Sequence, residues 1–234
     1  MGLAPTRTRA QSLIMEGVVF VNGQKVDKSG TLIKEDSDIS IKDSSLKYVS
    51  RGGLKLEGAL CHFEIGVRNK IALDVGASTG GFTDCLLQNG AARVYAVDVG
   101  YGQLDWKLRN DSRVVVMEKI NARHMQLDDI PELVDIIVID VSFISLTKII
   151  PPVIKLLKPG GVLVALIKPQ FEVGKGEVGK GGIVRDENKH KEVANKITKL
   201  MEELNFDVRG VIPSPITGAH GNKEFLLSAV KTFQ

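Results

Sequence analysis

The sequence predicts an α/β protein: a mostly parallel sheet of seven strands, the last one antiparallel, preceded by a small α+β module. From residue 70 onward, apolar runs of strand length alternate with helical patterns, as in a parallel sheet with helices on both faces. A glycine-rich turn follows the first of these runs, where a strand would pass into a helix. The first 46 residues differ, because they combine a basic helical stretch with a hairpin signal.

Length and composition fit this division. The chain has 234 residues, enough for a large and a small domain, and its 43% hydrophobic and 25% charged residues are ordinary for a globular protein. A net charge of +3 permits a nucleic-acid partner without requiring one. Cys61 and Cys85 lack metal-type spacing and predict reduced thiols in a cytoplasmic protein. The apolar runs are too short to span a bilayer and no signal peptide is expected, so we predict no membrane partner.

The small module, residues 1–46, is predicted to have a helix from Arg7. Arg7 and Arg9 lie in its first turn, where positive charge opposes the helix dipole, so phosphate contact and plain solvent exposure explain them equally well. Asn22-Gly23 between two apolar runs is the strongest short hairpin signal. The alternating stretch 31–41 predicts a further strand.

A linker and first helix are predicted at 47–58, where Arg51 and Lys55 border the sheet domain, 59–234. The final strand follows its predecessor too closely for a crossover helix, which predicts that it runs antiparallel. Right-handed crossovers place the ligand loops at the carboxyl ends of the parallel strands. We expect strands near 70–75, 93–98, 114–118, 134–140, 161–168, 207–213 and 223–231, and helices near 82–89, 103–109, 144–157 and 186–204.

An acid and a glycine-rich loop, in the pattern Asp-x-Gly-x-x-x-Gly-Gly, close the first strand. The loop lacks the lysine of a phosphate-binding P-loop and the Gly-x-Gly-x-x-Gly spacing of a dinucleotide site. A carboxylate beside a closely approaching backbone fits a cationic ligand such as S-adenosylmethionine, whereas the alternative is a plain strand-to-helix turn. The residues predicted to contact this cofactor are Asp74, Gly76, Ala77, Ser78, Thr79, Gly80, Gly81 and Phe82.

Polar residues also end the neighbouring strands. Asp98 ends the second strand, where a carboxylate accepts the ribose hydroxyls of either NAD or S-adenosylmethionine, and Val99 adjoins it. Asn121 follows the third strand, where an adenine edge would lie, and Asp140 ends the fourth, facing the loop across the sheet crevice. Each acid alone is best explained as a cap of a loop or helix. Together, Asp74, Asp98 and Asp140 at one rim predict a cofactor site.

Lys168 ends the strongly apolar run 162–167 and precedes Pro169. Because Lys168 stands at the end of a buried strand, its amine is expected to be partly desolvated. Desolvation favours the neutral form of the amine, which a general base requires. The alternative is a surface lysine whose aliphatic stem lies against apolar residues while its amine reaches solvent.

The segment 174–182 matches the Gly-x4-Gly-Lys pattern of an ATP site. Gly181 replaces the Ser or Thr that binds Mg²⁺, and the acidic strand precedes this segment instead of following it, so the ATPase interpretation fails. A mobile basic lid over RNA, bearing Lys175 and Lys180, fits better, and a disordered loop is the alternative. His220, in a later glycine-rich loop, is predicted to be a substrate contact or a bystander.

Several motifs in combination resemble a known family. Residues 6–11 and 17–23 are similar to an S4-type RNA-binding module. The remaining motifs are closely similar to the TlyA family, once described as hemolysins, which joins such a module to an FtsJ-like methyltransferase domain of Rossmann-like class I fold. They are Ser-Arg-Gly-Gly-Leu-Lys-Leu at 50–56, Asp-Val-Gly-Ala-Ser-Thr-Gly-Gly-Phe-Thr at 74–83, Lys-Pro-Gln-Phe-Glu at 168–172 and Gly-Asn-Lys-Glu-Phe-Leu at 221–226.

The resemblance implies S-adenosylmethionine-dependent 2′-O-ribose methylation of cytidine in ribosomal RNA, with ribosomal RNA or ribosomal subunits as partner and no metal. Lys55, Asp140, Lys168 and Glu224 match the catalytic Lys-Asp-Lys-Glu tetrad of FtsJ-like enzymes. The S4-type family usually has a further helix upstream, so the small module is expected to be incomplete at its start. RNA contacts are expected from Arg7, Arg9, Arg51, Lys175 and Lys180.

Methyl transfer to a ribose hydroxyl is an in-line displacement, in which the protein aligns the hydroxyl and removes its proton. Lys168 is the candidate for the proton transfer, oriented by Asp140 and Glu224; alternatively, it positions the hydroxyl while charged. Two other functions stay open at this point: a membrane-active hemolysin, and an RNA-binding protein with a non-catalytic nucleotide-binding domain.

Overall fold

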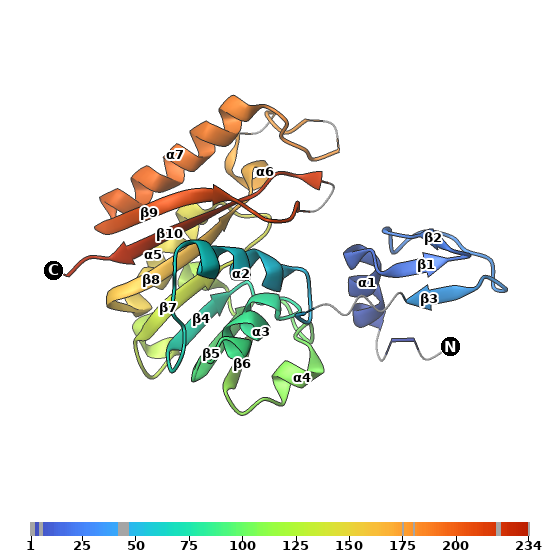
Figure 1. The fold of residues 1–234 in the computed structure, drawn as a ribbon, viewed down its shortest axis with the longest axis horizontal. Helices are drawn as coiled ribbons and strands as arrows, with labels where there is room; N and C mark the ends of the chain where they lie inside the picture. Colours follow the sequence, from blue (N-terminus) through green and yellow to red (C-terminus); the bar gives the residue numbers. More distant parts are fainter. Residues whose placement is uncertain are drawn as a thin grey trace.

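The computed structural model describes residues 3–4, 7–41, 47–174, 176–179, 181–218 and 221–233. Within these ranges the strands form one sheet of three strands in the first part of the chain and one of seven strands in the rest. Figure 1 shows the small sheet with its helix, and the large sheet between layers of helices. The predicted fold class, an α/β sheet domain with a small α+β module before it, is confirmed.

The small module contains the predicted hairpin. φ is positive at Asn22 and Gly23, as a two-residue primed turn requires. The predicted strand 31–41 is wrong in length, because the facing strand offers only three residues and Leu32, 99% exposed, has no sheet to pack on. The sheet has the order β2-β1-β3, and the elements are α1 (Arg7–Glu16), β1 (Val19–Val21), β2 (Gln24–Lys25) and β3 (Ile39–Ile41).

The large sheet has the order β6-β5-β4-β7-β8-β10-β9. Strands β4 to β8 run parallel, and β10 pairs antiparallel with both β8 and β9, as predicted for the last strand. The order around β4 is Rossmann-like, with the final strand inserted beside β8. The strands are β4 (Ile71–Val75), β5 (Arg93–Asp98), β6 (Val114–Glu118), β7 (Val134–Ile139), β8 (Leu157–Ile167), β9 (Phe206–Pro213) and β10 (Phe225–Lys231).

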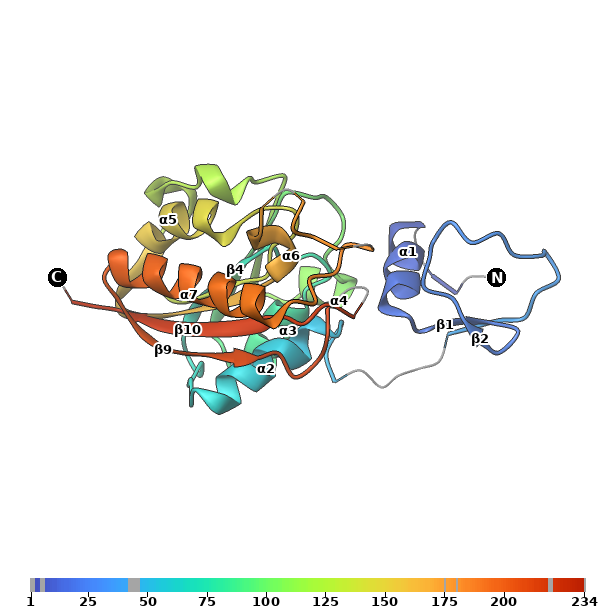
Figure 2. The ribbon, with the colours of Figure 1, turned by 90° about the horizontal axis from the view of Figure 1, so that it is seen from above.

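Helices cover both faces of this sheet (Figure 2). On one face, Leu56 of α2 shares a buried core with Ala72 of β4, and on the other, Ile197 of α7 shares a core with Leu73. Successive side chains of a strand point to opposite faces, so β4 supplies both cores. The helices are α2 (Gly52–His62), α3 (Gly81–Gln88), α4 (Trp106–Arg109), α5 (Ile150–Val153), α6 (Pro169–Glu172) and α7 (Glu187–Glu203).

The predicted helix 144–157 is wrong as a single helix. Pro151 and Pro152 have no N–H to extend an α-helical ladder, so the segment divides into three short pieces. Two of them are 3₁₀ helices, η3 (Leu146–Lys148) and η4 (Ile154–Leu156), on either side of α5.

The predicted helix 103–109 shortens to α4, because Asp105 caps its start by accepting a hydrogen bond from the backbone N–H of Lys107 at 3.0 Å. Strand β8 begins at 157 instead of 161, and α6 was not predicted. Two further unpredicted 3₁₀ helices are η1 (Ala122–His124) and η2 (Leu127–Asp129).

Candidate active site

The glycine-rich loop between β4 and α3 lies against the ends of the neighbouring strands. The backbone N–H groups of Gly76 and Ala77 both donate to the carbonyl oxygen of Val97, at 2.8 and 3.1 Å. φ is +86° at Gly76 and +97° at Gly80, the left-handed region that glycine adopts without a steric penalty. A Cβ at Gly76 would lie 2.5 Å from the carbonyl oxygen of Asp140, so this turn depends on a residue without a side chain.

Asp98 joins the loop after β5 to the glycine-rich loop. Its Oδ2 accepts a hydrogen bond from the backbone N–H of Ser78 at 2.8 Å, and its Oδ1 accepts one from Gly100 at 2.7 Å. A carboxylate oxygen can accept more than one hydrogen bond, so Asp98 keeps the capacity to accept ligand hydroxyls.

A cavity of about 600 Å³, the apolar hollow, opens at the carboxyl ends of β4, β5 and β7. Six of the residues predicted to bind the cofactor line this hollow: Gly76, Ser78, Asp98, Val99, Asn121 and Asp140. Its apolar wall is formed by Val97, Ile120, Val141 and Ile149, none of which was predicted as a site residue.

A second cavity of about 350 Å³, the charged hollow, adjoins the first, because Gly76, Ser78, Asp140 and Ser142 line both. The segment 216–218, which was not predicted, closes part of its wall. Its other predicted members are Arg51, Lys55, Ala77, Thr79, Gly81, Phe82 and Lys168.

Two lysine–carboxylate ion pairs belong to the charged hollow. Lys168 Nζ lies 2.5 Å from Asp140 Oδ1, although this pair is not aligned as a hydrogen bond, and it donates to Ser142 Oγ at 2.9 Å. Lys55 Nζ donates to Glu224 Oε2 at 2.6 Å, and Glu224 is buried. The fold thus places Lys55, Asp140 and Lys168 on one cavity. Glu224 does not line this cavity but forms an ion pair with Lys55, which does.

Gly218 makes room for this arrangement. A Cβ at that position would overlap the Oε1 atom of Glu224, so only glycine leaves space for the carboxylate. The wall at 216–218 therefore packs directly against the carboxylate that pairs with Lys55.

Asp74 lies beneath the glycine-rich loop and is fully buried. Its Oδ2 accepts a hydrogen bond from Thr83 Oγ1 at 2.7 Å, while its Oδ1 has no hydrogen-bond partner among the residues that the structure describes. Burial raises the pKa of Asp74 to about 7, and the negative charges of Asp140 and Asp98 add to that rise, whereas the Thr83 hydrogen bonds oppose it. Neither Asp74 nor Gly80 lines either hollow.

The basic residues expected to contact RNA fall in different places. Arg7 is exposed on α1 in the small module. Arg51 lines the charged hollow and donates to the carbonyl oxygen of Thr217 at 3.2 Å. The side chain of Arg9 and the residues Lys175, Lys180 and His220 lie outside the described part of the chain.

Ser142 and Phe143, which follow Asp140 closely, line the candidate site but are not among the residues predicted from the sequence. Ser142 contacts Lys168, and its place two positions after a predicted site acid was a usable signal. Phe143 lines the apolar hollow, is 91% exposed and has φ of +65°, a backbone state that sequence patterns do not reveal for a phenylalanine.

Across the described ranges, no group of three or more His, Cys, Asp or Glu side chains is placed to hold a metal ion. In the same part of the chain, no helix combines the length and the apolar character needed to cross a membrane.

Both parts of this chain are similar in sequence to known protein families. The family model described as FtsJ-like methyltransferase matches residues 48–231, and the S4 domain model matches 1–39. Hemolysin A of Brachyspira hyodysenteriae is 49% identical over 229 residues, which cover 96% of this chain and 94% of that protein. The 16S/23S rRNA (cytidine-2′-O)-methyltransferase TlyA of Mycobacterium tuberculosis is 45% identical over 227 residues, covering 97% of this chain and 85% of that protein.

A solved structure of a Streptococcus thermophilus protein is also similar, with a TM-score of 0.80 and 49% sequence identity, over 99% of this chain and 85% of that one. These matches confirm the resemblance to the TlyA family and the class I methyltransferase fold that the motifs predicted.

Proposed function

The chain belongs to the FtsJ-like methyltransferase family, and from that premise we propose that it transfers a methyl group from S-adenosylmethionine to the ribose 2′-hydroxyl of cytidine in ribosomal RNA. The name of the Mycobacterium tuberculosis relative supports this substrate and reaction. One observation carries the proposal: two lysine–carboxylate pairs lie on a cavity that adjoins a second cavity shaped by a glycine-rich loop.

The apolar hollow fits the proposed cofactor. Its volume of about 600 Å³ lies in the range usual for small-molecule sites. Val97 and Ile120 offer an apolar surface to an adenine ring, and Asp98 retains acceptor capacity for ribose hydroxyls. The absence of a Cβ at Gly76 lets the glycine-rich loop pack against the backbone of Asp140, and Asp140 offers a carboxylate to a cationic group. When bound there, S-adenosylmethionine supplies an electrophilic methyl group on a sulfonium.

Lys168 is the proposed proton acceptor. Asp140 and Ser142 hold its amine at the boundary between the two hollows, since both line the two cavities. In that position the neutral form of the amine, present after the ammonium has lost a proton to solvent, can accept a hydrogen bond from a ribose hydroxyl and take its proton as the oxygen attacks. Asp140 then stabilises the ammonium that results.

Lys55 and Glu224 provide a second charged pair on the charged hollow. Lys55 is nearly buried and its amine is fixed by Glu224, so its position is set before any substrate arrives. A fixed cation at this cavity suits the negatively charged ribose–phosphate backbone of RNA. Arg51, on the same cavity, adds a further positive charge.

We also propose the division of labour along the chain. Residues 1–46 form an S4-type RNA-binding module, 47–58 a linker and first helix, and 59–234 the methyltransferase domain, although the helix itself, α2, continues to His62. The S4 domain match supports an RNA-binding role for the first part. RNA contacts are proposed for Arg7, Arg9, Arg51, Lys175 and Lys180.

The proposed function is tested by incubating the protein with S-adenosylmethionine carrying a labelled methyl group and purified ribosomal subunits. Label in the RNA, retained after removal of protein, is the expected result. Calorimetric titrations with S-adenosylmethionine and with NAD accompany it. Binding of NAD alone, with no label in RNA, would instead favour an RNA-binding protein with a nucleotide site.

A further inference from the structure

Glu172 is a buried acid outside the candidate tetrad. It is the last residue of α6, four positions after Lys168, and its side chain is only 1% exposed. A carboxylate removed from water is costly unless hydrogen bonds and opposite charge replace the lost solvation. The partners of Glu172 therefore show what the residue holds in place.

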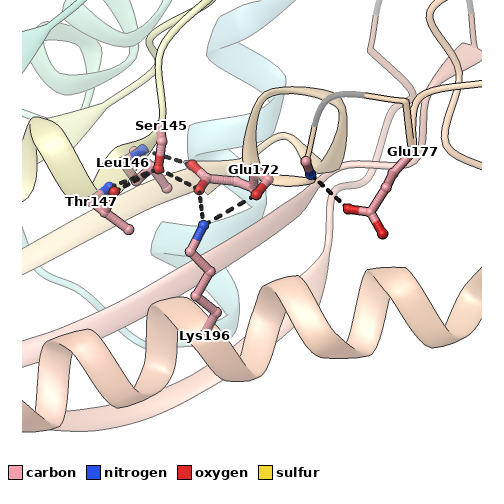
Figure 3. A network of polar contacts seen from close by, with 7 residues as sticks. Ser145, Leu146, Thr147, Glu172, Glu177 and Lys196 are labelled. Carbon is pink, nitrogen blue, oxygen red and sulfur yellow. Dashed lines mark hydrogen bonds and ion pairs between the residues drawn. The ribbon is translucent and has the colours of Figure 1, made fainter.

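Those partners come from two other segments (Figure 3). Oε1 accepts a hydrogen bond from the backbone N–H of Leu146 at 2.6 Å, and Oε2 accepts one from Ser145 Oγ at 2.6 Å. Lys196 of α7 lies 3.4 Å from Oε2 and donates to the backbone carbonyl oxygen of Glu172 at 3.1 Å. The carboxylate thus covers the start of η3, where it pairs with the backbone N–H of Leu146 while Ser145 Oγ accepts a hydrogen bond from the N–H of Thr147.

The segment that Glu172 holds leads directly from Asp140 to η3. Backbone pairing between β7 and β8 ends at Ile139 and Ala165. Beyond that point, side chains connect the loop after β7 to the segment formed by Lys168 and α6. Two contacts join these segments: the Lys168 amine to Asp140 and Ser142, and the ring of Phe171 to that of Phe143, with centroids 5.1 Å apart. Glu172 adds a third connection, from α6 to Ser145 and Leu146.

We propose that Glu172 is a positioning residue for methyl transfer: by binding Ser145 and Leu146, it fixes the loop after β7 against α6 and so sets Asp140 relative to Lys168. The inference rests on the proposed function. It assigns Glu172 no contact with substrate or cofactor, since Glu172 lines neither hollow. Its effect reaches the reaction only through the geometry of the Lys168–Asp140 pair.

The test compares Glu172→Ala, Glu172→Gln and Ser145→Ala with Lys199→Met, a matched control on the exposed side of α7. Glu172→Ala removes both hydrogen bonds, whereas Glu172→Gln keeps an acceptor for Leu146 and loses the charge facing Lys196. Because a shift of about 1 Å at reacting groups costs on the order of 100-fold in rate, we expect kcat to fall about 30-fold in Glu172→Ala and about 3-fold in Glu172→Gln. The KM for RNA and the Kd for S-adenosylmethionine should change less than about 3-fold, because Glu172 lines neither hollow.

Hydrogen exchange of the peptide 140–148 is measured on the same proteins without RNA. Exchange should be faster there in the Glu172 and Ser145 variants, unchanged elsewhere in the domain, and unchanged throughout in Lys199→Met. Unchanged exchange at 140–148 in Glu172→Ala, or faster exchange with an unaltered kcat, would overturn the assignment. A uniform rise in exchange across the domain would also overturn it, since the residue would then only stabilise the fold.

Ser145→Ala leaves the Leu146 bond in place and serves if Glu172→Ala does not fold. Failure of the wild-type protein to label RNA would contradict the proposed function, while the exchange measurements would still decide whether Glu172 fixes this loop. The two claims therefore fail in different experiments.

Discussion

The apolar hollow and the charged hollow adjoin each other, yet they are built differently. One wall of the apolar hollow is shaped by backbone: φ is positive at Gly76, and the amides of Gly76 and Ser78 bond to Val97 and Asp98. Asp98 ends β5, Asn121 lies in the loop after β6 and Asp140 follows β7, so the order of strands brings these three residues together.

The charged hollow is also lined by the glycine-rich loop, through residues 76–79, 81 and 82, but its other walls are side chains from distant segments. The Lys55–Glu224 bond joins residues 169 positions apart, and residues 216–218 close the cavity from a third part of the chain. A site made of backbone can be recognised from one motif, whereas a site made of side chains depends on the completed fold. In the proposed function the apolar hollow binds the cofactor and the charged hollow performs the chemistry. Substitutions in the two hollows are therefore predicted to have different effects, on cofactor binding and on kcat respectively.

Loss of the Lys168 amine should have the largest effect. We expect Lys168→Met to lower kcat about 1000-fold, because a positioned proton acceptor contributes roughly 100- to 10,000-fold, while the Kd for S-adenosylmethionine changes little. Lys158→Met is the matched control, since Lys158 pairs with Asp135 at 2.7 Å near the opposite ends of the same two strands. Equal losses in the two variants would show that the Lys168 pair acts only on stability.

A methyl group at Gly76 should damage the apolar hollow instead. In Gly76→Ala, the new Cβ meets the carbonyl oxygen of Asp140 at 2.5 Å and the backbone must leave a φ of +86°, so we expect calorimetry to show S-adenosylmethionine binding weakened by about 100-fold. Gly66→Ala, where the added Cβ meets open space, is the control. Unaltered cofactor binding in Gly76→Ala would separate this loop from the cofactor.

The corresponding change in the charged hollow is Gly218→Ala. Its Cβ would displace the carboxylate of Glu224 and disturb the pair with Lys55, so we expect kcat to fall about 10-fold with little change in cofactor affinity, in contrast to Gly76→Ala. Steady-state kinetics and calorimetry on the same two proteins make the comparison. If Gly218→Ala weakens cofactor binding as much as Gly76→Ala does, the two hollows act as a single site.

Asp74, beneath the apolar hollow, should affect stability more than catalysis. Burial raises its pKa from 3.8 to about 7, so the protonated form is favoured in the folded protein. This contribution to stability is fully present below pH 3.8 and is lost as pH rises through about 7. We expect Asp74→Asn to remove that dependence and to raise the free energy of unfolding by about 1–2 kcal/mol at pH 8. Chemical denaturation at pH 5 and pH 8 measures it, and parallel losses in wild type and variant between the two pH values would contradict the assigned titration.

The sequence was sufficient for elements with strong local patterns. Asn22-Gly23 predicted its hairpin, the apolar runs predicted the seven strands of the large sheet, and the short connection before β10 predicted its antiparallel direction. The helix predicted at 144–157 is wrong, because Pro151 and Pro152 lack the N–H groups that a continuous helix needs, although the apolar spacing is helical.

The candidate site was predictable where residues end strands or match a motif, as Asp98, Asp140 and Lys168 do. The positive φ of Phe143 and the wall at 216–218 depend on tertiary contacts, so no local pattern announced them. Glu172 stands in the motif Lys-Pro-Gln-Phe-Glu, but only the structure shows that it binds Ser145 and Leu146.

The most direct measurement of the proposed function is nuclease digestion and mass spectrometry of ribosomal RNA treated with the protein and S-adenosylmethionine. The expected product is 2′-O-methylcytidine, present with wild-type protein and with Lys158→Met and strongly reduced with Lys168→Met. Methyl groups found only on nucleobases, or no methylated nucleoside at all, would contradict ribose 2′-O-methylation of ribosomal RNA as the function of this protein.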